Sequence, residues 1–133
     1  MTKKHSLIFR IIFFVYIAAV LFLCFGKFDS SPSVPLSILG IPSDKIVHFC
    51  MFLPFPILGF LAYDRYTESA GQTLLFVGIT LVAGLLLALF TELGQAHFTS
   101  YRSGDKCDFA ADAIALLAGS IAVAVINVRK QRK

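Results

Sequence analysis

The sequence contains no tryptophan and only three cysteines, and these shortages narrow the classes of protein that it can belong to. Tryptophan is the residue that most often marks a membrane interface, so its absence excludes a strong tryptophan belt, while 14 phenylalanines supply apolar surface. Cys24 and Cys50 lie in apolar segments, and Cys107 lies in a polar loop. Because their number is odd and no C-x-x-C occurs, the sequence predicts neither a disulfide framework nor a zinc site.

Hydrophobic residues make up 57% of the 133 residues, and the mean hydropathy is +0.79. A soluble domain has an apolar share nearer ~45–50%. Four apolar runs, at about 7–25, 46–63, 74–92 and 109–128, each approach the ~20 residues that cross a bilayer. The sequence therefore predicts an all-α integral membrane protein, a single domain over 1–133 folded as a four-helix transmembrane bundle. The first run is long and has no good cleavage site, which favours an uncleaved anchor over a signal peptide.

The basic residues are divided unequally between the two sides of the predicted bundle, and this division predicts its orientation. Eight lie on the side of the two termini, and four lie on the other side. The first group is Lys3, Lys4, Arg10, Arg65, Arg129, Lys130, Arg132 and Lys133; the second is Lys27, Lys45, Arg102 and Lys106. We therefore expect both termini to be cytoplasmic. The net charge of +4 comes from these topology signals and forms no patch, so no nucleic-acid partner is expected.

Polar residues occur in pairs at three predicted helix ends on the outer side. The pairs are Asp44 with His48, Glu92 with Gln95, and Asp108 with Asp112. Spacings of three and four residues place each pair on one helical face. Small residues continue the same faces, namely Thr80, Gly84 and Ala88 before Glu92, and Ala115, Gly119 and Ala122 after Asp112. Because small residues mark helix contacts in membranes, we expect the pairs to point into the bundle.

The second span carries two prolines, Pro54 and Pro56. A proline lacks the N–H that an α-helix needs, so carbonyl groups about one turn earlier, near Cys50 and Phe52, lose their partners. The sequence therefore predicts a kink in this span.

Three blocks of this sequence together resemble the signatures of a known family. The first is Asp44-Lys45-Ile46-Val47-His48-Phe49, and the second is Glu92-Leu93-Gly94-Gln95. They resemble the D-K-x-x-H-F and E-x-x-Q signatures of the VanZ-like family of membrane proteins. Arg102, Asp108 and Gly119 resemble its R…D-x-x-x-N…G ending, with Asp112 in place of the usual Asn and Ala115 where Gly is frequent. The resemblance implies a small protein of the bacterial cytoplasmic membrane that is linked, through the founding member, to tolerance of the glycopeptide teicoplanin. It supplies no reaction.

Three interpretations of the polar residues stay open at this point. The residues concerned are Asp44, Lys45, His48, Glu92, Gln95, Arg102, Asp108 and Asp112. The first interpretation is a structural network in which Arg102 pairs with acids, and it predicts closely paired side chains without a cavity. The second is a binding site for an anionic lipid-linked or cell-wall precursor that approaches from the outer leaflet of the membrane lipids, or for a glycopeptide. Lys45, Arg102 and Lys106 would then meet phosphate or carboxylate groups.

The third interpretation is catalysis. His48 beside Asp44 would act as a general base, and Glu92 with Asp108 would hold a divalent metal, because hard cations favour carboxylate oxygens. The reaction would be hydrolysis or group transfer on a lipid-linked substrate. The sequence has no H-E-x-x-H or serine-nucleophile motif, so it assigns no firm metal ligand and leaves enzyme activity open.

Overall fold

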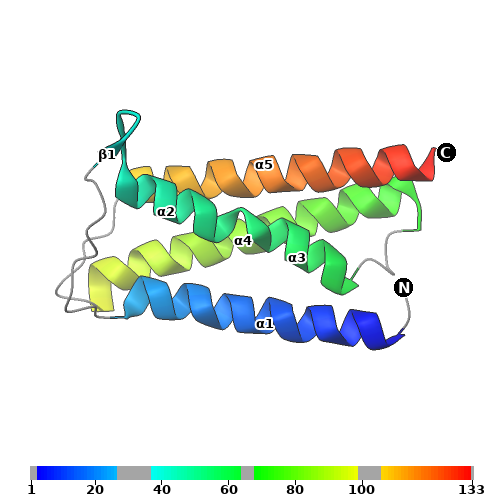
Figure 1. The fold of residues 1–133 in the computed structure, drawn as a ribbon, viewed down its shortest axis with the longest axis horizontal. Helices are drawn as coiled ribbons and strands as arrows, with labels where there is room; N and C mark the ends of the chain where they lie inside the picture. The colour runs from blue at the N-terminus through cyan, green and yellow to red at the C-terminus, as the bar shows by residue number, and fades with distance from the viewer. Residues whose placement is uncertain (1–2, 27–36, 64–67, 99–105, 133) are drawn as a thin grey trace.

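A computed structural model describes residues 3–26, 37–63, 68–98 and 106–132 of the chain (Figure 1). The described residues are helical apart from one small hairpin. The helices are α1 (Lys3–Phe25), α2 (Ser43–Phe52), α3 (Pro54–Tyr63), α4 (Ala70–Phe98) and α5 (Lys106–Gln131), and the strands are β1 (Ser37–Ile38) and β2 (Ile41–Pro42). The strands pair antiparallel across Leu39 and Gly40, whose positive φ angles of 53° and 80° suit a tight hairpin turn.

Four helical segments are long and apolar enough to cross a membrane, which confirms the four predicted spans. They are His5–Phe25, Asp44–Tyr63, Ala70–Phe98 and Lys106–Gln131. The third begins earlier than the predicted residue 74 because Ser69 and Gln72 cap it. The Gln72 backbone N–H donates to Ser69 Oγ (3.2 Å), while Gln72 Oε1 accepts from the backbone N–H groups of Glu68 and Ser69. This reciprocal capping satisfies N–H groups that a helix start otherwise leaves unpaired.

The second span is broken where the sequence predicts a kink. Helix α2 ends at Phe52 and α3 begins at Pro54, although the Leu53 N–H still donates to the Phe49 carbonyl (3.0 Å). The Tyr16 hydroxyl of α1 donates to the Met51 carbonyl, within a turn of the break. An exposed backbone carbonyl in a membrane is costly, so a hydrogen bond from a neighbouring helix stabilises the kink.

Gly119 of α5 lets the kinked second span pack closely against α5. A Cβ atom at Gly119 would lie 2.5 Å from Pro56 Cγ and 2.9 Å from the Leu53 carbonyl oxygen.

The predicted stripe on α4 is buried as expected, at Thr80, Gly84 and Ala88. On α5 the stripe continues through Val123 rather than Ala122, which is exposed. At ~100° per residue, position 122 is roughly 80° from the direction of Asp112, whereas position 123 is within roughly 20°.

The buried core is narrow, and large apolar side chains cover the outside of the helices. Phe52, Phe55 and Leu116 are buried at its centre, together with small residues of α4 and α5. Outward-facing side chains include Leu75, at 66% exposed, and Ile114, at 61%. A soluble protein rarely shows such continuous apolar surface, and lipid contact accounts for it.

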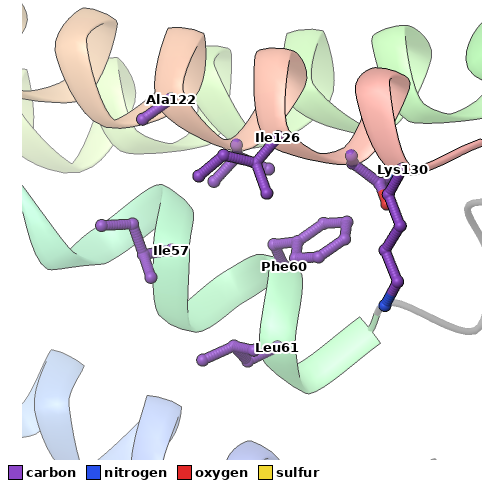
Figure 2. A pocket seen from close by; sticks show the side chains of 8 residues that line it. Ile57, Phe60, Leu61, Ala122, Ile126 and Lys130 are labelled. Carbon is purple, nitrogen blue, oxygen red and sulfur yellow. The ribbon is translucent and has the colours of Figure 1, made fainter.

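The two ends of the bundle differ in what they contain. Both termini lie at one end, and the starts of α2 and α5 and the end of α4 lie at the other (Figure 1). Near the terminal end, Arg10 Nε donates to the Ala62 carbonyl (3.2 Å), and its guanidinium lies 4.8 Å from the Tyr63 ring centre. A pocket of about 360 Å³ lies between α3 and α5, lined mainly by apolar side chains such as Ile57 and Phe60 (Figure 2).

Candidate functional site

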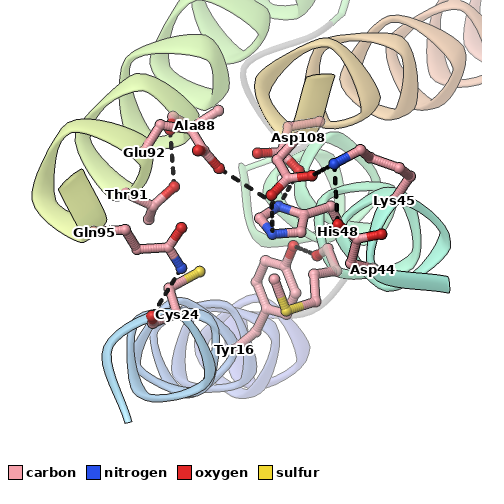
Figure 3. Close-up of polar contacts among 12 residues, drawn as sticks. Tyr16, Cys24, Asp44, Lys45, His48, Ala88, Thr91, Glu92, Gln95 and Asp108 are labelled. Carbon is pink, nitrogen blue, oxygen red and sulfur yellow. Dashed lines mark hydrogen bonds and ion pairs between the residues drawn. The ribbon is translucent and has the colours of Figure 1, made fainter. Parts of the chain in front are cut away.

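His48 is the centre of a group of ionisable side chains that three helices bring together. His48 lies on α2, Glu92 on α4, and Asp108 and Asp112 on α5, and all four are buried. His48 Nδ1 lies 3.0 Å from Asp112 Oδ1, which is hydrogen-bond distance. Glu92 Oε1 lies 3.8 Å from the same nitrogen, and Asp108 Oδ2 lies 3.6 Å from Nε2 (Figure 3). Members of all three predicted pairs therefore meet around one imidazole. The prediction was wrong for Asp44, which is exposed rather than directed into the bundle.

Local sequence explains why these side chains can meet. Ala88 lies one turn before Glu92, and Ala115 lies one turn after Asp112, and both alanines are fully buried. Such small residues let neighbouring helices approach closely in a membrane. Asp108 is in the first turn of α5, where the helix dipole favours a negative charge. The arrangement thus combines close helix packing with a favourable position for one of the acids.

Lys45 neutralises part of this acidic group. Its ammonium forms a salt bridge with Asp108, and it lies 3.0 Å from Asp44 Oδ2. The Lys45 side chain is 17% exposed, whereas that of Asp44 is 58% exposed. An exposed ion pair contributes little, so the bond to Asp108 is the important one. The ammonium of Lys45 therefore pairs with acidic side chains of the protein itself.

Gln95 lies beyond Glu92 and contacts α1. Its Nε2 donates to the Cys24 carbonyl (2.8 Å), and the side chain is almost fully buried (Figure 3). Together with the Tyr16 bond to Met51, this contact ties α1 to the helices that carry the charged group. Sequence reasoning did not single out Tyr16, although a tyrosine within an apolar run needs a partner for its hydroxyl.

The remaining predicted residues lie at the edge of this group or beyond the described part of the chain. Arg102 falls in 99–105, outside the described residues, so its expected role as counter-charge stays a prediction. Lys106 is exposed at the first residue of α5. Of the free cysteines, Cys24 is buried and both Cys50 and Cys107 are exposed.

The arrangement has three chemical capacities. One ligand atom each from His48, Glu92 and Asp108 can be chosen so that all lie within 4.8 Å of one another, a spacing that suits a shared metal ion. Asp112 is fully buried, and its Oδ2 has no hydrogen-bond partner among the described residues. The carboxylates can also accept hydrogen bonds from hydroxyl or amide donors. The imidazole, oriented by Asp112, can accept or release a proton.

Comparison with protein-family models, with curated proteins and with solved structures gives no match to this chain. What can be said of its function therefore comes from the four spans and from the chemistry around His48.

Proposed function

We propose that this chain is a VanZ-like protein of the bacterial cytoplasmic membrane that binds the polar headgroup of a lipid-linked cell-envelope precursor. The observation that carries the proposal is the convergence of His48, Glu92, Asp108 and Asp112 at one end of a bundle of four apolar, membrane-length helical segments. Ionisable side chains in membrane spans are costly and usually mark a functional site.

The chemistry of the group indicates what kind of headgroup it would take. Carboxylates accept hydrogen bonds from sugar hydroxyls and amide N–H groups, which lipid-linked precursors of the envelope carry. The apolar outer surfaces of α4 and α5, at Leu93 and Ile114 for example, would lie against the lipid chain. Lys106 is exposed beside Asp108 and would meet a phosphate of the same molecule.

Orientation forms part of the proposal. The excess of basic residues on the side of the termini favours cytoplasmic ends, and the charged group would then face the outer leaflet. Exposed Cys107 beside this group provides a test in intact cells. In a Cys24→Ala/Cys50→Ala background, a membrane-impermeant maleimide should label Cys107. Labelling only after the membrane is made permeable would place Cys107 on the cytoplasmic side and contradict the proposed orientation.

Lipid identification in the purified protein tests the binding function. Native mass spectrometry of wild type released from mild detergent should detect a retained lipid with a glycosylated or phosphorylated headgroup. Glu92→Gln keeps the shape of the side chain but removes its charge, so it should lose this lipid. Thr73→Val, at the other end of the bundle, should retain it. The same bound lipids in wild type and Glu92→Gln would refute the proposal. A raised teicoplanin tolerance on expression, lost in Glu92→Gln, would extend it to the antibiotic.

One observation favours a second candidate, hydrolysis or transfer on the same lipid. Asp112 holds His48 through Nδ1, which leaves Nε2 as the acceptor for a proton. With no metal ion bound to it, Nε2 would take a proton from an attacking water and later return it to the leaving oxygen. If this is correct, His48→Gln should bind the lipid but release no product, as followed by chromatography of the extracted lipid. Unchanged product release in that variant would remove the enzymatic candidate.

A further inference from the structure

The separations between ligand atoms around His48 are those of a metal site rather than of a closed hydrogen-bond network. His48 Nε2 and Asp108 Oδ2 are 3.6 Å apart, too far for a hydrogen bond. Two ligands bound at ~2.0–2.2 Å to one ion lie roughly 3.0–3.6 Å apart. Glu92 supplies a third ligand, because one ligand atom from each of His48, Glu92 and Asp108 lies within 4.8 Å of the others. Its Oε1 lies 3.8 Å from the other ring nitrogen, Nδ1, so its carboxylate would have to turn toward Nε2 to bind the same ion.

Among the described residues, carboxylates predominate around His48. Those of Glu92, Asp108 and Asp112 are buried there, and Lys45 forms a salt bridge with Asp108. Buried carboxylates are costly unless they are paired or coordinate a metal, so such a cluster favours a divalent cation.

Asp112 has the position of a residue that orients a metal-bound histidine. Its Oδ1 accepts a hydrogen bond from His48 Nδ1–H, which fixes the tautomer in which Nε2 carries the lone pair. Carboxylates in this position are typical partners of metal-binding histidines. Asp112 Oδ2 is fully buried and has no hydrogen-bond partner among the described residues, so this carboxylate keeps an acceptor for a further donor at the site.

We infer that His48 Nε2 and the carboxylates of Glu92 and Asp108 form a binding site for one divalent cation, with Asp112 as a positioning residue. One nitrogen and two carboxylate ligands without a thiolate favour Mn²⁺ or Zn²⁺ over softer ions. The ion would also let an acidic site accept a phosphorylated headgroup. That second part rests on the proposed function, whereas the cation site itself does not.

Mn²⁺ binding to the full-length protein in detergent, after treatment with EDTA, tests the site directly. Wild type should bind one Mn²⁺ per chain, followed by electron paramagnetic resonance, and Zn²⁺ should compete. Glu92→Gln and Asp108→Asn should each weaken binding at least about tenfold, and Asp112→Asn about 10–100-fold. Glu68→Gln, an exposed acid on the other side of the bundle, should bind like wild type.

A measurement on wild type alone tests the site even if the variants fail to fold. Electron spin echo modulation of the bound Mn²⁺ should show coupling to an imidazole nitrogen. No saturable Mn²⁺ binding to wild type, binding without a nitrogen ligand, or equal binding in folded Glu92→Gln would overturn the site.

The link to the headgroup needs a separate measurement. Retention of a polyprenyl diphosphate in nanodiscs is compared with and without Mn²⁺. Retention that needs Mn²⁺ would support the ion as the phosphate contact. Equal retention without Mn²⁺ would overturn that link but leave the proposed lipid-binding function standing. No retention by the Mn²⁺-loaded protein would count against a diphosphate headgroup, while the cation site would stand on the binding data alone.

Discussion

In the described part of the bundle, a group of polar side chains joins α4 to α5 near each end, and the two groups differ in their chemistry. Near the termini, Thr73 accepts hydrogen bonds from Asn127 Nδ2 (2.8 Å) and Gln131 Nε2 (3.1 Å) and donates to the Ser69 carbonyl (3.0 Å). These contacts join α4 to α5 without any charged side chain. At the other end, the same two helices meet through Glu92, Asp108 and Asp112 around His48.

This difference argues against a purely structural role for the charged end. The neutral group shows that hydroxyl and amide side chains are sufficient to join α4 and α5 in this fold. Three buried carboxylates around one imidazole are a far more expensive means to the same contact, because each charge must be desolvated. A function that uses the charges accounts for their presence, and the following experiments separate the two ends.

His48→Ala should have the largest effect on stability. The substitution leaves the fully buried Asp112 carboxylate without its hydrogen bond to His48, and removing one partner of a buried charge costs about 3–5 kcal/mol. Unfolding by SDS titration from detergent micelles, followed by circular dichroism, would measure this loss. The double variant His48→Ala/Asp112→Ala should lose less than the sum of the single changes, because the two side chains share one hydrogen bond. Additive effects would mean that the two residues are not coupled.

Gly119→Ala tests the packing of the kinked span on α5, between the two polar groups. The added methyl would lie 2.5 Å from Pro56 Cγ and 2.9 Å from a backbone oxygen, so helices α3 and α5 must move apart. We expect a loss of about 1–3 kcal/mol in the same unfolding assay. Gly78→Ala is the matched control, because its Cβ would meet nothing within 4 Å and alanine favours the helix by up to ~1 kcal/mol. Equal effects of the two substitutions would contradict the close approach at Gly119.

The same contrast explains what the sequence could predict. Long apolar runs identify spans because lipid tolerates no unpaired backbone, and spacings of three and four placed Asp112 and Glu92 on inward faces. The proline pair predicted a kink in the second span, where the structure has a break at Leu53, because a missing N–H has only local consequences. These features depend on one helix at a time.

Contacts between helices were harder to foresee. The pairing of His48 with Asp112, and not with its own helix neighbour Asp44, depends on the rotation of α2 against α5. Gln95 contacts the Cys24 carbonyl of α1 because that helix happens to end beside it, which no spacing encodes. The Ala122 prediction was wrong because a stripe drawn with small residues drifts from the true 3.6-residue period. The spacing of residues within one helix therefore does not determine how that helix is rotated against its neighbours.

Thr73→Val should have the smallest effect and would complete the comparison. Valine keeps the branched shape but removes the hydroxyl that pairs with Asn127 and Gln131, so a loss of about 1 kcal/mol is expected. Hydrogen bonds between membrane helices are individually weak, because the unfolded helices find other partners. The unfolding assay gives the stability, and Mn²⁺ binding to the same sample should be unchanged, since no part of the neutral group contacts His48 in the described structure. A large fall in Mn²⁺ affinity on Thr73→Val would show instead that the two ends are coupled through α4 and α5. The contrast between a structural end and a functional end would then have to be abandoned.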